Sequence, residues 1–108
     1  MKRLLEVCID SFASAKAAFE GGADRLEVCS ALSVGGTTPS ISLINECVQT
    51  LGVPSMVMIR PHDGGFVYDE DDFRIMVGEI RAAKSAGAHG IVFGALSADG
   101  DLDVDGCR

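Results

Sequence analysis

The fold is decided by the segment DRLEVCS (residues 24–30), which is followed by the glycine and threonine loop GGTTPS (residues 35–40). The segment predicts a short strand that ends in a turn and leads into a helix. Because successive side chains of a strand point to opposite faces, Arg25, Glu27 and Cys29 share one face, and the apolar residues between them share the other. One face of this strand is therefore apolar, and the other carries two charges and a thiol.

A near copy of this segment lies upstream, at LLEVCID (residues 4–10). It places Glu6 and Cys8 in the positions that Glu27 and Cys29 occupy in the second segment. We therefore expect two neighbouring strands to present a Glu-x-Cys pattern at the same depth. The rest of the chain then serves to frame these two strands.

Strand-like and helix-like segments alternate along the whole sequence, and glycine turns separate each helix from the strand that follows it. We expect strands over residues 3–9, 24–29, 54–60 and 89–94, and helices over residues 14–20, 41–51 and 69–87, with a further helix opening at residues 104–108. Turns recur at the length of one βα unit. This pattern predicts an α/β fold with a parallel sheet and right-handed crossovers.

An open sheet and a (β/α)8 barrel both fit this alternation. Strands of an open parallel sheet are covered by helices on both faces and tend to be continuously apolar. Here the first two strands carry Glu6, Arg25 and Glu27 among apolar residues, and the lumen of a barrel can accept such side chains. A nucleotide-binding GxGxxG or P-loop pattern is also missing after the first strand. We therefore favour a TIM-like barrel, of which this chain supplies about the first four βα units.

Composition excludes several classes of function. The formal charge is −7, and the nine Lys and Arg residues are scattered, so we expect no nucleic-acid partner. The N-terminus lacks the pattern of a signal peptide, and no apolar segment is long enough to span a bilayer. We expect a single domain over residues 1–108, cytoplasmic and without membrane contact. Because the cysteines show no CxxC spacing, we expect free thiols and neither a zinc ribbon nor a thioredoxin motif.

Five separated motifs together resemble the copper homeostasis protein family CutC. They are EVCID (6–10), GGADRLEVCS (21–30), GGTTPS (35–40), MIRP (58–61) and VFGAL (92–96). The resemblance implies a TIM-like barrel of about 250 residues, so that it covers only the N-terminal half of the family's barrel. We therefore interpret the chain as a fragment or a truncated product, and we expect the complete protein to be a homo-oligomer.

The resemblance also implies a cytoplasmic protein that handles copper, with Cu(I) bound at cysteines at the ends of the first two strands. Those positions are Cys8 and Cys29 in this sequence. Thiolates are soft ligands that suit Cu(I), and neighbouring parallel strands lie about 4.8 Å apart. The alternative is that both cysteines are small core residues, because free cysteine is among the most buried residue types.

A second interpretation of the barrel is an enzyme that acts on a small anionic metabolite. In this interpretation Arg60 anchors the anion, Glu6 or Glu27 transfers a proton, and His62 serves as a metal ligand or general acid. The structural alternative is that Glu6, Arg25, Glu27 and Arg60 form a buried ionic network. The corresponding alternative for His62 is a solvated loop residue.

Other polar clusters have simpler explanations. The glycine and threonine loop can cradle an anion with its N–H groups, but such loops also need glycine only to turn. The acidic run at residues 69–72 is expected to begin a helix, and the aspartates at residues 99–105 lack the glutamate that a calcium loop requires. We expect Cys47 to be structural and Cys107 to be incidental.

Overall fold

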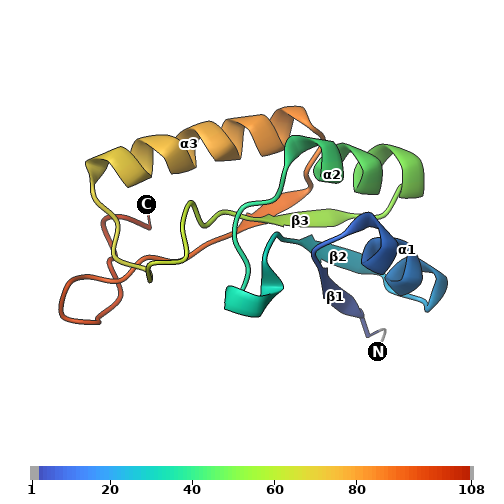
Figure 1. The fold of residues 1–108 in the computed structure, drawn as a ribbon, viewed down its shortest axis with the longest axis horizontal. Coiled ribbons are helices and arrows are strands. Elements are labelled where there is room, and N and C mark those ends of the chain that lie inside the picture. Colours follow the sequence, from blue (N-terminus) through green and yellow to red (C-terminus); the bar gives the residue numbers. More distant parts are fainter. Residues whose placement is uncertain (1–2, 108) are drawn as a thin grey trace.

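A parallel sheet lies at the centre of the chain in the computed structural model, which describes residues 3–107. Its strands follow one another in the order β1-β2-β3-β4 (Figure 1). They are β1 (Glu6–Ile9), β2 (Arg25–Val28), β3 (Ser55–Met58) and β4 (Gly90–Val92). All four predicted strands are confirmed, each somewhat shorter than the sequence pattern suggested.

The helices begin where side-chain oxygens cap their first turns. They are α1 (Phe12–Glu20), α2 (Ile41–Asn45) and α3 (Glu70–Ser85). The segment η2 (Glu46–Leu51) continues α2 as a π-helix, and a short 3-10 turn, η1 (Leu32–Val34), follows β2. Ser11 accepts a hydrogen bond from the Ser14 N–H to cap α1, and Ser40 caps α2 in the same way. Asp69 caps α3, so the acidic run does begin a helix, as predicted.

All three α-helices lie on one face of the sheet (Figure 1). Their apolar side chains and the helix-facing side chains of the strands form the core, which includes Leu26, Val28, Val57, Ile44 and Met76. An open doubly wound sheet would carry helices on both faces. Consecutive strand order with helices on a single face is the arrangement of part of a TIM-like barrel, whose other face is the lumen.

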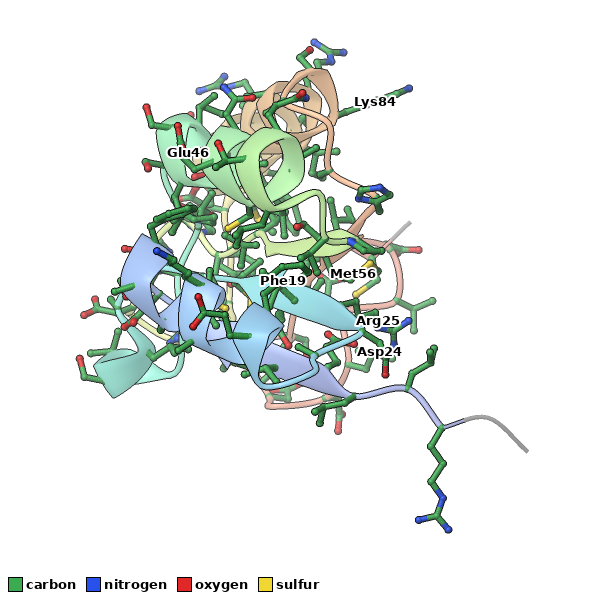
Figure 2. All side chains as sticks on the ribbon, turned by 90° about the vertical axis from the view of Figure 1, so that its right-hand side faces the viewer. Phe19, Asp24, Arg25, Glu46, Met56 and Lys84 are labelled. Atoms are coloured by element: carbon green, nitrogen blue, oxygen red, sulfur yellow. The ribbon has the colours of Figure 1, made fainter. Side chains whose placement is uncertain are left out.

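The lumen face carries the polar side chains of the strands. Figure 2 views the sheet from the end where the strands begin. The side chains of Arg25 and Met56 are visible at this end of the strands, and Lys84 projects from α3 away from the sheet. Met56 leans over β4, because a Cβ atom at Gly90 would lie 2.5 Å from its Cε atom. Glycine at residue 90 thus makes room for a lumen side chain.

The register of β1 against β2 differs from the expected one. Glu6 lies opposite Arg25, and Cys8 lies opposite Glu27, so the two cysteines are not at the same depth. The turn before β2 explains this, because the N–H groups of Asp24 and Arg25 both donate to the Leu5 carbonyl, at 2.8 and 3.2 Å. That bond pattern fixes the start of β2, and Cys29 lies beyond the level of Cys8.

The C-terminal segment corrects two further expectations. Residues 104–107 form a turn and not a helix, while residue 108 lies outside the described part. The turn nevertheless has the hydrogen bonds of a helix start, since Asp103 accepts from the Gly106 N–H through its side chain, at 2.9 Å. Cys107 is not incidental, because it packs against the core. Between residues 3 and 107 no helix has the length and apolar character needed to span a bilayer.

Candidate functional site

An ion pair occupies the first level of the lumen face. The Arg25 Nε atom donates to the Glu6 Oε2 atom at 2.6 Å, from neighbouring strands. This pair compensates both charges. The Glu6 carboxylate is therefore already engaged with a cation from the neighbouring strand.

Glu27, the next lumen residue of β2, contacts two other predicted site residues. The Cys8 thiol donates to the Glu27 Oε2 atom at 3.3 Å, and the Cys29 Sγ atom lies 3.9 Å from Glu27 Oε1. Cys29 also contacts the Glu27 carbonyl oxygen at 3.7 Å. The carboxylate of Glu27 thus lies between two thiols that come from the ends of β1 and β2.

The two thiols differ in exposure and are both hard to ionise. Cys8 is exposed, whereas Cys29 is 1% exposed. Burial, followed by the charge of Glu27, raises the pKa of Cys29 to about 12. Burial and the hydrogen bond with Glu27 also raise the pKa of Cys8. Both groups are therefore protonated at neutral pH, and a metal ion that binds them must displace their protons.

The glycine and threonine loop closes over Cys29. Gly36 has a φ of +96°, and a Cβ atom at this position would lie 3.5 Å from the Cys29 Sγ atom. The Leu32 N–H donates to the Asp10 carboxylate at 3.2 Å, and a bridge between Ser30 and Thr37 closes the base of the loop. The loop therefore shields one thiol while the other stays open to solvent.

Arg60 fastens this loop to the end of β3. Its Nη1 atom donates to the carbonyl oxygens of Val34 and Gly36, at 2.7 and 3.1 Å. Its backbone N–H donates to the Thr38 hydroxyl at 2.8 Å, and the Phe66 ring lies 4.6 Å from its Cζ atom. Only part of the alternative ionic network is present: Glu6 pairs with Arg25, and the ion pairs of the described residues include neither Glu27 nor Arg60.

His62 belongs to the loop that follows β3. Its Nδ1 atom accepts from the Gly64 N–H at 3.0 Å, so the ring proton is on Nε2, which lies 3.4 Å from the Asp72 carboxylate. A hydrogen bond from the Asp69 backbone, assisted by His62, lowers the pKa of Asp72. His62 therefore ties the loop to the first turn of α3, and the structure records no hydrogen bond from it to either lumen cysteine within residues 3–107.

The sequence analysis missed two residues that the structure places in polar interior positions. Tyr68 is 8% exposed and packs edge to face against His62 and Phe73. Glu79 lies on α3 and lines a groove of about 370 Å³ between α2 and α3. An acidic residue one helical turn before the buried Ala83 was the available signal for Glu79. Nothing in the sequence around Tyr68 distinguishes it from an ordinary loop residue.

The donor set limits what the site can do with a metal ion. Among residues 3–107, no group of three or more His, Cys, Asp or Glu side chains is arranged to hold a metal ion together. Cys8, Glu27 and Cys29 offer two soft thiol donors with a carboxylate between them. Such a set suits a soft monovalent ion better than a hard divalent cation, which prefers several oxygen ligands.

The consecutive parallel strands with helices on one face place the chain among the barrel-type α/β proteins. The CutC family matches residues 3–108, and the chain belongs to that family. It is 50% identical over 104 residues to the human copper homeostasis protein cutC homolog, and 48% identical over 100 residues to a CutC family protein of Aliivibrio fischeri. These matches cover 96% and 93% of this chain, but only 38% and 40% of the relatives.

Solved structures agree with this assignment. A crystal structure named for the copper homeostasis protein CutC of Streptococcus agalactiae matches 98% of this chain and 52% of its own, with a TM-score of 0.89 and 34% identity. A structure from Burkholderia cenocepacia named for a phosphonomutase is 22% identical with a TM-score of 0.61, which shows a shared fold alone. The predicted family and the partial TIM-like barrel are both confirmed. The chain spans about two fifths to one half of these proteins.

Proposed function

We propose that this chain takes part in cytoplasmic copper homeostasis by binding Cu(I) between Cys8 and Cys29. The observation that supports the proposal most directly is that both thiols approach the same carboxylate, Glu27, from two neighbouring strands. The names of the relatives link the family to copper homeostasis. Because the chain spans only part of those proteins, the action of a complete protein is part of the proposal.

The chemistry of the proposed site follows from the protonation of its thiols. A Cu(I) ion binds thiolates, so it displaces one proton from each cysteine. The Glu27 carboxylate already accepts a hydrogen bond from the Cys8 thiol and therefore lies on the path by which that proton would leave. Cys8, which is exposed, would meet the ion first, and Cys29, under the glycine loop, would complete a shielded pair of ligands.

The proposal is tested by an anaerobic Cu(I) titration against a competing chelator. The wild-type chain is compared with the double variant Cys8→Ser, Cys29→Ser, and we expect the variant to lose one tight equivalent of Cu(I). Cys47→Ser is the matched control, because Cys47 is fully buried among apolar side chains away from the lumen. Equal and weak binding by all three proteins would reject the copper site and leave Cys8 and Cys29 without a role as metal ligands.

A second candidate function is an enzyme that acts on a small anionic metabolite. The observation that favours it is the Arg60 guanidinium, which is 6% exposed and makes no ion pair with a described carboxylate. Glu27 would be the proton-transfer residue in preference to Glu6, because Glu6 is paired with Arg25. The substitution Cys8→Ser separates the two functions: it should abolish the tight Cu(I) equivalent and leave anion binding intact, whereas Arg60→Ala should abolish anion binding but also releases the loop over Cys29.

A further inference from the structure

Residues 31–36 form a short loop, here called the lid, on the connection between β2 and α2. Two backbone hydrogen bonds between Ser30 and Thr37, at 2.9 and 2.7 Å, close its base. Above the base, Gly35 and Gly36 have φ values of +93° and +96°, a backbone conformation that glycine adopts readily. The lid is therefore a compact turn that reverses sharply above a fixed base.

Few interactions hold the lid against the rest of the molecule. In the described part of the chain, three hydrogen bonds join it to other elements. Two run from the Arg60 Nη1 atom to the carbonyl oxygens of Val34 and Gly36, and one runs from the Leu32 N–H to the Asp10 carboxylate. Four of the six lid residues are exposed. A segment with so few buried contacts opens locally at a lower free-energy cost than the core does.

The lid covers one of the two lumen thiols and leaves the other open. Cys29 is 1% exposed, and a Cβ atom at Gly36 would lie 3.5 Å from its Sγ atom. Cys8, by contrast, is exposed. An ion or a reagent in solvent therefore reaches Cys8 directly, but it reaches Cys29 only after the lid has moved.

We propose that Arg60 is a positioning residue that latches the lid over Cys29, so that opening of the latch controls when the second thiol is available to a metal ion. The metal part of this inference rests on the proposed copper function, whereas the latch itself does not. Arg60 is anchored independently of the lid, because its backbone N–H donates to the Thr38 hydroxyl and its guanidinium lies over the Phe66 ring. It thus provides a fixed point to which the lid can close.

The contacts of Arg60 act where the lid touches the thiol. Its bond to Gly36 holds the residue that packs on Cys29, whereas the Asp10 bond holds the lid further along, at Leu32. Asp10 also contributes to the raised pKa of Cys29, so its substitution would change ionisation as well as access. Removing the Arg60 cation can only disfavour a thiolate, and a faster reaction of Cys29 in such a variant therefore reports access.

The latch is tested by iodoacetamide modification of Arg60→Met, followed by peptide-resolved mass spectrometry. We expect Cys29 to react about tenfold faster or more than in wild type, because two hydrogen bonds from a charged donor are lost, while Cys47 stays protected. Arg60→Lys, which keeps a charged donor, should give an intermediate rate. The control Arg81→Met removes a charge from an exposed position of α3 and should react as wild type does. An unchanged Cys29 rate in Arg60→Met would overturn the latch.

A second measurement needs no variant and so does not depend on the folding of Arg60→Met. In wild type, opening of the lid exposes little surface, so the Cys29 rate should hardly change at low urea concentrations. Cys47 is fully buried in the core and reacts only through a larger unfolding, so its rate should rise steeply with urea. The same urea dependence for both thiols would show that Cys29 is exposed by unfolding and not by the lid, and would overturn the proposal.

The metal part is tested by the rate at which bound Cu(I) passes to an excess of chelator. We expect Arg60→Met to bind the same number of Cu(I) equivalents as wild type and to release them about tenfold faster. Unchanged release together with faster Cys29 alkylation would overturn the control of metal exchange. Absence of a tight Cu(I) equivalent in wild type would instead reject the proposed copper function, and the alkylation rates would still decide the latch.

Discussion

The two Glu-x-Cys repeats are nearly identical in sequence and occupy different environments. In the first repeat, Glu6 pairs with Arg25 and Cys8 is exposed. In the second, Glu27 accepts from one thiol and lies near another, and Cys29 is fully enclosed. The difference shows that the chemistry of each repeat is set by its neighbours across the sheet and not by its own residues.

The origin of the difference is the position of each strand in the sheet. β2 pairs with β1 on one side and β3 on the other, whereas β1 pairs only with β2 among the described residues. The register then moves Glu27 to the level of Cys8. As a result, a charge that is neutralised in one repeat is shared between two thiols in the other.

The largest expected difference between the repeats is in thiol reactivity. With a pKa of about 12, Cys29 forms roughly a thousandfold less thiolate near neutral pH than an ordinary cysteine does, and its burial slows reagents further. We therefore expect iodoacetamide to modify Cys8 far faster than Cys29. Peptide-resolved mass spectrometry measures both rates, and Cys47 reports unfolding because it is fully buried. Similar rates in a chain whose Cys47 is protected would contradict the enclosure of Cys29.

The apolar residue before each glutamate gives the second comparison. Leu26 is 0% exposed, whereas Leu5, at the corresponding position of the first repeat, is 51% exposed. We expect Leu26→Ala to lower the free energy of unfolding by about 3 kcal/mol, because it removes core contacts and leaves a cavity. Leu5→Ala should cost about 0.5 kcal/mol or less. Urea unfolding measures both values, and equal losses would mean that the two repeats are packed alike.

The Cu(I) affinity should depend strongly on pH if both repeats supply a ligand. Because the pKa of each thiol is raised, both thiols are protonated over the range from about pH 6 to pH 8. Binding then releases two protons, so the association constant should rise by about a hundredfold per pH unit. In Cys8→Ser or Cys29→Ser one thiol remains, and the rise should be about tenfold. Chelator competition at several pH values measures these slopes, and a pH-independent affinity would exclude thiolate ligands.

Most of the fold could be predicted because it depends on local patterns. Capping residues such as Ser11, Ser40 and Asp69 mark the helix starts, and alternating or continuous apolar residues mark the strands. A polar face on β2 indicated a lumen. The expected helix after residue 104 failed, since that segment forms a turn held by Asp103 and residue 108 lies outside the described part.

The candidate site was predicted in composition but not in arrangement. The sequence indicated Cys8, Glu27 and Cys29 as site residues. Their relative positions depend on the register of β1 against β2, which is set by backbone hydrogen bonds to Leu5 and cannot be read from the repeated sequence. The burial of Tyr68 was missed for a similar reason. The fold of the loop buries Tyr68, and the sequence does not show that its hydroxyl lacks a hydrogen-bond partner among the described residues.

The smallest expected effect separates the two glutamates directly. Glu27→Gln removes the negative charge between the thiols, so the pKa of Cys8 should fall and its alkylation near neutral pH should become about fivefold faster. Glu6→Gln should change that rate by less than about twofold. The reason is that Glu6 is the weakest of the influences on Cys8, and its charge is already compensated by Arg25.

The measurement is the pH profile of Cys8 alkylation in both variants, with the Cys29→Ser background used to isolate one thiol. Each glutamine variant keeps the size and shape of the side chain, so a change in rate reports charge and not packing. If Glu6→Gln lowered the pKa of Cys8 as much as Glu27→Gln does, Cys8 would not lie closer to Glu27 than to Glu6. The register that distinguishes the two repeats would then be refuted, because only the observed pairing places Cys8 opposite Glu27.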